Sequence, residues 1–237
     1  METVLVVGAT GNIGVSAVTA ALRSKRNVLA IVRNDESSKR LIKHVGTSEG
    51  IICVQADVTS DNGVRNVVDQ VRAGKLPAFQ HVWSSVGGEY VSVPLEEIDT
   101  ERLRRNMNIS FEANFFAYRD TIGFLRDQNH PQSTWTICTG MQGELAIFPL
   151  PAMTQGALFP MCIAGMRENE ETNVRFNEVF LGFRVEHDED AITHGVVKAS
   201  DFATVYELIL NDETARSSRI KVLTPEDMKK LNIQKRY

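Results

Sequence analysis

The sequence predicts an α/β fold of one domain over residues 1–237, in which a doubly wound, mostly parallel sheet of seven strands has helices on both faces. Three observations predict it. Short apolar runs alternate with helical periodicities along the chain, as in sheets built from right-handed crossovers. A glycine-rich turn follows the first apolar run. A length of 237 residues with 43% hydrophobic side chains supplies one core of ordinary size.

The stretch from Val4 to Gly14 reads V-L-V-V-G-A-T-G-N-I-G and organises the chain. It describes a buried strand, a turn permitted by Gly8, and a helix that packs closely on the strand because of Gly14. Gly11 lets the backbone approach a pyrophosphate, which the free N–H groups of the helix N-terminus attract. The alternative is a plain tight turn. We expect a Rossmann-type dinucleotide site held by Gly8, Thr10, Gly11, Asn12, Ile13 and Gly14.

The first half of the chain continues the alternation. A helix follows the glycine turn, and its inner face carries Val15, Val18, Ala21 and Leu22. Two more helices are expected at residues 37–45 and 59–73. Strands are expected at residues 28–32, 51–56 and 79–84. This half has no linker and no repeat, so it predicts parallel strands joined by helices.

The second half has longer helices and less regular connections. Helices are expected at residues 95–105, 109–126, 154–167 and 199–210, with Pro160 near the middle of the third or bending it. Strands are expected at residues 134–139, 174–181 and 220–223, and the charged tail after Thr224 is expected at the surface. The helix at 109–126 has an apolar face that fits either the core or a partner helix, made by Phe111, Phe115, Tyr118, Ile122 and Leu125.

Composition excludes several classes of function. The formal net charge of −4 gives no basic face for nucleic acid, and no apolar run approaches membrane-spanning length. Cys53, Cys138 and Cys162 lack the paired spacing of a zinc site, so we expect reduced thiols and no metal. A core strand begins within four residues of Met1, which leaves no room for a signal or transit peptide. We therefore expect a cytoplasmic protein.

The end of the second strand indicates the type of dinucleotide. Arg33 follows the strand at 28–32, where an acidic residue would bind the adenosine ribose hydroxyls of NAD. A guanidinium suits the 2′-phosphate of NADP instead. The alternative is a solvated loop charge. We expect NADP(H), with Arg33 at its 2′-phosphate.

With these elements placed, the chain resembles the short-chain dehydrogenase/reductase family over nearly its whole length. The resemblance rests on five stretches: Gly8 to Gly14, Asp57-Val58, Ser84 to Gly88 (where the family has Asn-Asn-Ala-Gly), Pro94 to Asp99 with the following Asn108, and Asn173 to Gly182. The glycine spacing is closer to the extended and atypical branches of the family. The resemblance implies that Asp57, Val58, Ser85 and Gly87 also contact the cofactor. It further implies a homodimer or homotetramer formed through the helix at 109–126.

The segments that match the family's catalytic motifs lack its catalytic side chains. Family members use a Ser, a Tyr as general acid and base, and a Lys four residues after the Tyr, assisted by an Asn. The resemblance places Gly140 at the Ser, Pro151 at the Tyr and Gln155 at the Lys. No Tyr occurs between Tyr118 and Tyr206, so a shift of register cannot restore the phenol. We expect dinucleotide binding without ordinary alcohol dehydrogenase chemistry.

This combination leaves three functions open. The first is an enzyme of secondary-metabolite biosynthesis that catalyses acid-assisted isomerisation, cyclisation or rearrangement of a small apolar organic substrate. Relatives in natural-product tailoring with Pro at the Tyr position do such chemistry, and this chain is similar to them in Pro151. The second is an NADPH-dependent reductase of an activated imine or enone, which needs no proton donor. The third is a non-catalytic NADP(H) sensor that signals to a protein partner. We favour the first.

The acid for the first function is expected in the loops that leave the fourth, fifth and sixth strands, because these loops face the cavity of a doubly wound sheet. Glu144 is preferred, since apolar neighbours would raise its pKa; the alternative is a glutamate in water. Tyr90 offers a replacement phenol, and Glu89 and Asn108 complete the candidate catalytic set.

Other residues of these loops are weaker candidates. Arg184, Glu186 and His187 leave the sixth strand, and His81 and His194 have no partner pattern and are expected to be structural. The apolar walls of the cavity are expected from Met141, Phe148, Met153, Phe159 and Phe183.

Overall fold

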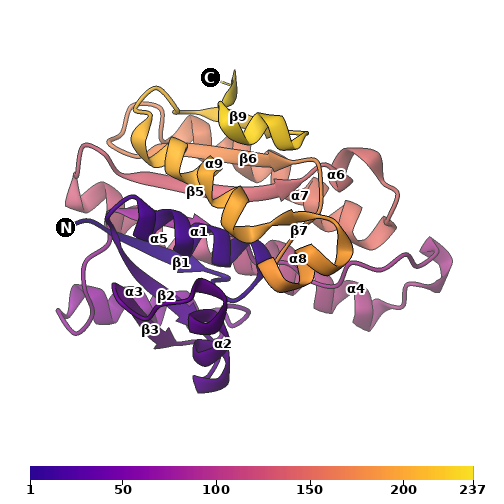
Figure 1. Ribbon diagram of the computed structural model, residues 1–237, viewed down its shortest axis with the longest axis horizontal. Helices are drawn as coiled ribbons and strands as arrows, with labels where there is room; N and C mark the ends of the chain where they lie inside the picture. Colours follow the sequence, from indigo (N-terminus) through magenta and orange to yellow (C-terminus); the bar gives the residue numbers. More distant parts are fainter. Residues whose placement is uncertain (237) are drawn as a thin grey trace.

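The computed structural model describes residues 1–236 and confirms the α/β fold (Figure 1). Eight strands form one sheet in the order β10-β9-β6-β5-β4-β1-β2-β3. All neighbouring strands are parallel except β10, which pairs antiparallel with β9. The chain reverses its direction of winding between β1 and β4, and in such sheets a ligand binds at the carboxyl ends of the strands next to this reversal.

The strands of the main sheet are β1 (Thr3–Val7), β2 (Asn27–Val32), β3 (Ile51–Gln55), β4 (His81–Ser84), β5 (Thr134–Gly140), β6 (Arg175–Leu181), β9 (Ser218–Val222) and β10 (Asn232–Lys235). A second, two-stranded sheet contains β7 (Val185–Glu186) and β8 (Val197–Lys198).

Helices cover both faces of the main sheet (Figure 1). One face carries α1 (Asn12–Arg23), α2 (Asp35–Val45) and α9 (Ala199–Asn211). The other carries α3 (Gly63–Arg72), α5 (Ala113–Gln128) and α7 (Pro149–Glu168). The remaining helices are α4 (Thr100–Met107), α6 (Gln142–Leu145), α8 (Asp188–His194), two 3₁₀ helices at Leu95–Glu97 and Pro225–Lys229, and a π-helical turn at Asn108–Glu112 that joins α4 to α5.

Strand β1 shows how the sequence builds two cores at once. Its side chains alternate between the faces, so Val4 and Val6 pack under α1 and α9, whereas Leu5 and Val7 pack under α3 and α5. All four are fully buried. A strand buried on both faces reads as a continuous apolar run, which explains the V-L-V-V pattern.

Helix α7 is longer than expected. It begins at Pro149 instead of residue 154, because the first turn of a helix needs no backbone N–H and so accepts Pro149 and Pro151. Pro160 lies inside the helix, which continues past it to Glu168. The residues expected to form a loop before the helix are therefore part of it.

Two further differences concern the carboxyl-terminal part. The tail after Thr224, expected only at the surface, forms a 3₁₀ helix and then β10, so the sheet has eight strands where seven were expected. A capping box between Thr224 and Asp227 starts the 3₁₀ helix. The connection from β6 to α9 contains β7, α8 and β8, which were not predicted because each is short.

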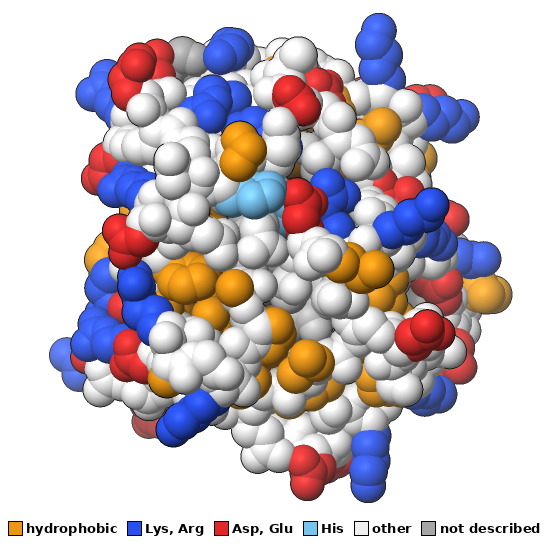
Figure 2. Space-filling view, turned by 90° about the vertical axis from the view of Figure 1, so that its left-hand side faces the viewer, with side chains coloured by type: hydrophobic (Ala, Val, Ile, Leu, Met, Phe, Trp, Pro, Cys, Tyr) orange, Lys and Arg blue, Asp and Glu red, His pale blue; other side chains and the backbone are white. Residues whose placement is uncertain are grey.

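The surface is of mixed charge. On the side of the molecule where the chain begins, acidic and basic side chains are interspersed (Figure 2). No helix in the described part of the chain is both long enough and apolar enough to cross a membrane.

Candidate functional site

Three glycines shape the turn between β1 and α1. Gly8 has a left-handed backbone (φ +85°), and a Cβ atom there would lie 2.8 Å from the carbonyl oxygen of Ser85. A Cβ atom on Gly14 would lie 2.0 Å from the carbonyl oxygen of Gly8, so α1 packs against the turn only because this side chain is absent. A Cβ atom on Gly11 would approach only the Gly8 carbonyl oxygen, at 3.6 Å, because Gly11 borders a cavity.

The N-terminus of α1 starts at this turn. Gly11 caps the helix with an extended backbone and no side-chain hydrogen bond, and the first turn contains no acidic residue. Such a helix start attracts phosphate, since its N–H groups lack partners and its dipole is positive there. The side-chain oxygen of Asn12 is used elsewhere, because it accepts a hydrogen bond from the His187 amide at 3.1 Å. The residues present therefore fit the pyrophosphate of a dinucleotide.

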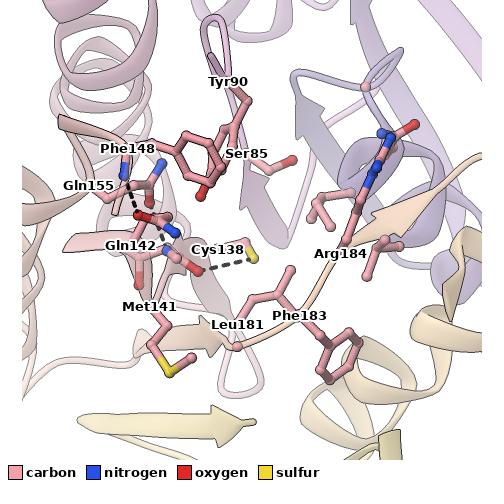
Figure 3. Close-up of a pocket in the computed structure, with 18 of the residues that line it drawn as sticks. Ser85, Tyr90, Cys138, Met141, Gln142, Phe148, Gln155, Leu181, Phe183 and Arg184 are labelled. Carbon is pink, nitrogen blue, oxygen red and sulfur yellow. Dashed lines mark hydrogen bonds between the residues drawn. The ribbon is translucent and has the colours of Figure 1, made fainter. Parts of the chain in front are cut away.

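A cavity of about 790 Å³ extends from this helix end along the carboxyl ends of β4, β5 and β6 (Figure 3). At its glycine-turn end, Asn12 and Ile13 face Arg184 and Glu186, which are the only charged side chains among the described residues that line it. Its opposite end, here called the Gly140 end, is lined by the uncharged Tyr90, Gly140, Met141, Gln142, Leu145, Phe148 and Gln155. Of the wall residues expected from the sequence, Met141, Phe148 and Phe183 line the cavity, and Met153 and Phe159 do not.

Three residues from different elements meet at the Gly140 end (Figure 3). The side-chain oxygen of Gln155, on α7, accepts a hydrogen bond from the Gly140 amide at 2.7 Å. The Tyr90 hydroxyl lies 3.7 Å from the point where a Cβ atom on Gly140 would stand. Because the Gln155 oxygen is occupied, its NH₂ group is the part of the amide left to donate to a ligand, next to the Tyr90 hydroxyl.

Tyr90 is the one residue of the four predicted catalytic residues that lines the cavity, all four lying within the described range. Its ring packs against that of Phe148, with the centroids 5.7 Å apart, and the outer part of the residue is exposed. Burial of the hydroxyl raises the pKa of Tyr90. The phenol therefore keeps its proton at neutral pH and is a hydrogen-bond donor.

Buried polar side chains hold the segment after β4. Ser110 accepts a hydrogen bond from the Gly88 amide at 2.8 Å, and Asn114 binds both the N–H and the C=O of Val86, at 3.2 and 2.8 Å. With Asn106, these residues recur every four positions and so share one face of the α4–α5 run. Sequence reasoning missed them, although three polar residues at this spacing were the available signal.

The apolar surroundings expected for Glu144 are not found. Its half-exposed carboxylate forms an ion pair with Arg219 at 2.8 Å. Arg219 also makes two hydrogen bonds to the buried Glu178, at 2.8 and 3.2 Å, and its guanidinium lies over the rings of Phe159 and Phe180. We therefore correct the interpretation of Glu144: a strong cationic partner holds it as a carboxylate, and it does not line the cavity.

Glu89 and Asn108 also lie outside the cavity lining. Arg102 contacts both oxygens of the Glu89 carboxylate, at 2.7 and 3.1 Å, and Asn106 donates to it at 2.8 Å. These partners, Arg102 first, lower the pKa of Glu89, so it is a carboxylate and not the proton donor considered from the sequence. Asn108 donates to the carbonyl of Thr59 at 3.0 Å, away from the substrate space.

The other predicted cofactor residues follow β1, β2 and β3, which are neighbours in the sheet. Arg33 is exposed and has no hydrogen bond or ion pair with any other described residue. Asp57 accepts hydrogen bonds from the amide and hydroxyl of Thr59, at 2.9 and 2.6 Å, and so shapes the loop after β3. Thr10 and Val58 are half-buried. Their contact with a dinucleotide stays a prediction.

The charged residues of the glycine-turn end form a small network. Glu186 pairs with Arg184 and with the Nδ1 atom of His194, the latter at 2.6 Å. These two partners, His194 first, lower the pKa of Glu186. His187 does not line the cavity and stacks on His44, with ring centroids 3.7 Å apart. Within residues 1–236, no three His, Cys, Asp or Glu side chains are grouped to hold a metal ion.

Comparison with known proteins decides the family. The family described as short chain dehydrogenase matches residues 2–141. The short-chain dehydrogenase/reductase iacG of Pestalotiopsis fici is 53% identical over 232 residues, which cover 96% of this chain and 93% of that protein. The chain belongs to the short-chain dehydrogenase/reductase family.

Solved structures of short-chain dehydrogenase/reductases share the fold. ElxO with NADP bound has a TM-score of 0.78 at 17% identity, over 90% of this chain and 93% of its own. A short-chain dehydrogenase/reductase from Brucella melitensis has a TM-score of 0.77 at 20% identity, over 93% and 94% of the two chains. One from Bacillus anthracis reaches 0.80 at 15% identity, again over 93% and 94%.

Proposed function

We propose that this short-chain dehydrogenase/reductase catalyses an acid-assisted isomerisation, cyclisation or rearrangement of an uncharged, apolar small molecule in secondary-metabolite biosynthesis. The observation that carries the proposal is the Gly140 end of the cavity. There the Tyr90 hydroxyl and the Gln155 amide adjoin the same point above Gly140, and the described lining residues include no charged side chain. Such a site favours a neutral ligand that has one hydrogen-bonding oxygen and an apolar body.

We infer that Gly140, Pro151 and Gln155 stand where other family members have Ser, Tyr and Lys. In support of this, Gln155 bonds to Gly140 at the cavity, and Pro151 is buried one helical turn earlier on α7. Proline has no proton to give, and a neutral amide cannot stabilise a phenolate by charge. In this interpretation the usual proton relay for alcohol oxidation is absent.

Tyr90 and Gln155 would act on a carbonyl or similar oxygen of the substrate. Both are donors fixed before the substrate binds, so they stabilise negative charge that develops on that oxygen. The protonated state of Tyr90 suits this role, because burial keeps the proton on the phenol. Met141 and Phe148 would shield the reacting part of the molecule from water.

The glycine turn, the N-terminus of α1 and Arg33 would hold NADP(H), which supplies hydride-transfer chemistry when bound. The fit rests on the unpartnered helix start at Gly11 and on the unpaired guanidinium of Arg33. In the favoured function the dinucleotide is retained and shapes the glycine-turn end of the cavity.

The second candidate is an NADPH-dependent reductase of an activated imine or enone. The complete dinucleotide cradle favours it, and so does the name of iacG, the relative that is 53% identical. An activated acceptor needs no strong acid, so hydrogen bonds from Tyr90 and Gln155 suffice.

One experiment separates these functions. Candidate apolar ketones, enones and imines are incubated with the protein, with and without NADPH, while product and NADPH absorbance are both followed. Product without a change in NADPH supports the rearrangement. Stoichiometric NADPH oxidation overturns it in favour of the reductase, and NADPH binding without any product favours the sensor.

We also propose that the protein forms a homodimer or homotetramer through α5 and α7. Phe115 on α5 is exposed beside a hollow lined by Phe111, Tyr118 and Met161. Sedimentation velocity of the wild type and of Phe115→Glu tests this, with a shift to monomer expected in the variant.

A further inference from the structure

Exposed apolar side chains gather in two segments of the chain. Of the eleven large apolar side chains that the described residues expose, six lie in the segments that follow β4 and β5: Tyr90, Val91, Leu95, Leu145, Ile147 and Met153. Scattered exposed apolar residues are normal on a soluble protein, but a contiguous group marks a binding surface.

The two segments meet at the mouth of the cavity. Tyr90 and Leu145 line the cavity, and Val91 is the next residue after Tyr90. Ile147 lies between Leu145 and Phe148, which both line it. The contact between the rings of Tyr90 and Phe148 joins the two segments (Figure 3). We call the exposed residues Tyr90, Val91, Leu145, Ile147 and Met153 the apolar rim.

We propose that the apolar rim binds a hydrocarbon chain or ring of the substrate that extends out of the cavity. This rests on the proposed function, because it places the polar atom of the same molecule at Tyr90 and Gln155. The Gly140 end of the cavity and the rim form one continuous uncharged surface, with Tyr90 belonging to both. The substrate is therefore a neutral molecule with an oxygen-bearing head and an apolar tail too long for the cavity alone.

The charges next to the rim favour a small molecule over a membrane. Glu96 and Glu97 follow Leu95 and are exposed, so an anionic lipid surface would be repelled. Glu144 lies next to Leu145, with its charge paired to Arg219. The remaining rim surface is uncharged and covers hydrocarbon without burying an unpaired ion.

The test uses straight-chain 2-alkanones of increasing length as neutral probes, with binding to the NADPH-loaded protein measured by calorimetry. Affinity should rise about two- to fourfold for each added methylene group, and should continue to rise for tails that reach the rim. Ile147→Ser should weaken the longest probes by roughly three- to tenfold and leave the shortest unchanged. The matched control is Ile192→Ser on α8, because Ile192 and Ile147 are 68% and 62% exposed; it should change neither.

Three results would overturn the proposal. Affinity that stops rising at a short tail would show that the rim is not used. Equal losses for short and long probes in Ile147→Ser would indicate general damage to the cavity. A shift of oligomeric state caused by Ile147→Ser would assign the rim to a protein interface. These are binding measurements, so product formation without length discrimination removes the rim alone, and length discrimination without product removes the proposed reaction alone.

Discussion

The side-chain oxygen of Gln155 lies 2.7 Å from the Gly140 amide nitrogen and accepts its hydrogen bond. The contact joins β5 to α7 across the floor of the cavity and fixes the orientation of the amide group. A lysine at this position has no acceptor and could not make the contact. The same contact leaves the NH₂ group of Gln155 as the donor next to Tyr90.

Replacing that donor should abolish most of the activity without unfolding the protein. Gln155→Glu keeps an acceptor for the Gly140 amide but removes the NH₂ group, so we expect product formation to fall by roughly 10²-fold. Tyr90→Phe should cause a loss of similar size, and the double variant should lose less than the two effects combined, since both donors serve one oxygen. Measurements of kcat/KM and of the melting temperature check this; full turnover by Gln155→Glu would remove Gln155 from the mechanism.

Arg33 should determine the preference for NADPH. Arg33→Ala removes an exposed guanidinium that has no other described partner, so NADPH affinity should fall at least about tenfold while NADH affinity changes little. Lys39→Ala, which removes an exposed charge on the nearby α2, is the control. Titration of both dinucleotides measures the effect, and equal losses for the two would contradict the assignment.

The ion pairs of Arg219 should differ in strength. Glu144→Gln breaks the pair at its exposed end and should cost under about 1 kcal/mol of unfolding free energy, with turnover retained. Glu178→Gln removes the partner that is fully buried and should cost about 3 kcal/mol, because a buried guanidinium then lacks its main counter-charge. Urea unfolding measures both. Loss of turnover in Glu144→Gln with an unchanged fold would restore Glu144 as the acid.

Glu2 should make the protein less stable in acid. Its carboxylate accepts hydrogen bonds from His81 at 3.1 Å and from Arg26 at 2.6 Å, and the His81 contact is the main reason that its pKa falls from 4.5 to about 2. The folded state favours the carboxylate, so this stabilisation is complete above pH 4.5 and is lost as the pH falls toward 2.

Glu2→Gln tests this directly. The side chain is 28% exposed, so the expected cost at neutral pH is reduced to about 1 kcal/mol. Urea unfolding across pH 2 to 7 should show the wild type and the variant converging in acid. A constant difference at every pH would show that the contact stabilises the fold by packing and not by charge.

The parts of the fold that the sequence predicts well depend on local requirements. Gly8 and Gly14 are needed by contacts within a few residues of one another, so the turn between β1 and α1 could be predicted. Alternating apolar periodicities located nearly every strand and helix of the main sheet. The short β7, β8 and β10 have too few residues for a periodic signal, and the start of α7 was obscured by prolines that a first helical turn accepts.

The candidate site depends on long-range partners and was predicted less well. Glu144 looked like a desolvated acid because its neighbours in sequence are apolar, but Arg219 is 75 residues away and could not be paired with it. The position of Tyr90 depends in the same way on Asn106, Ser110 and Asn114, which hold the segment before it. Local apolar character therefore predicted the wrong acid.

Strand β10 has a consequence for the cavity that its distance from the cavity conceals. Gln234 in β10 pairs with Arg219 in β9, and Arg219 in turn contacts Glu144 on α6, next to the lining residues Gln142 and Leu145. Removing residues 232–236 would leave the outer edge of β9 without its hydrogen-bonded neighbour. Truncations and carboxyl-terminal fusions of this protein therefore disturb substrate access through a chain of contacts that begins at the last strand.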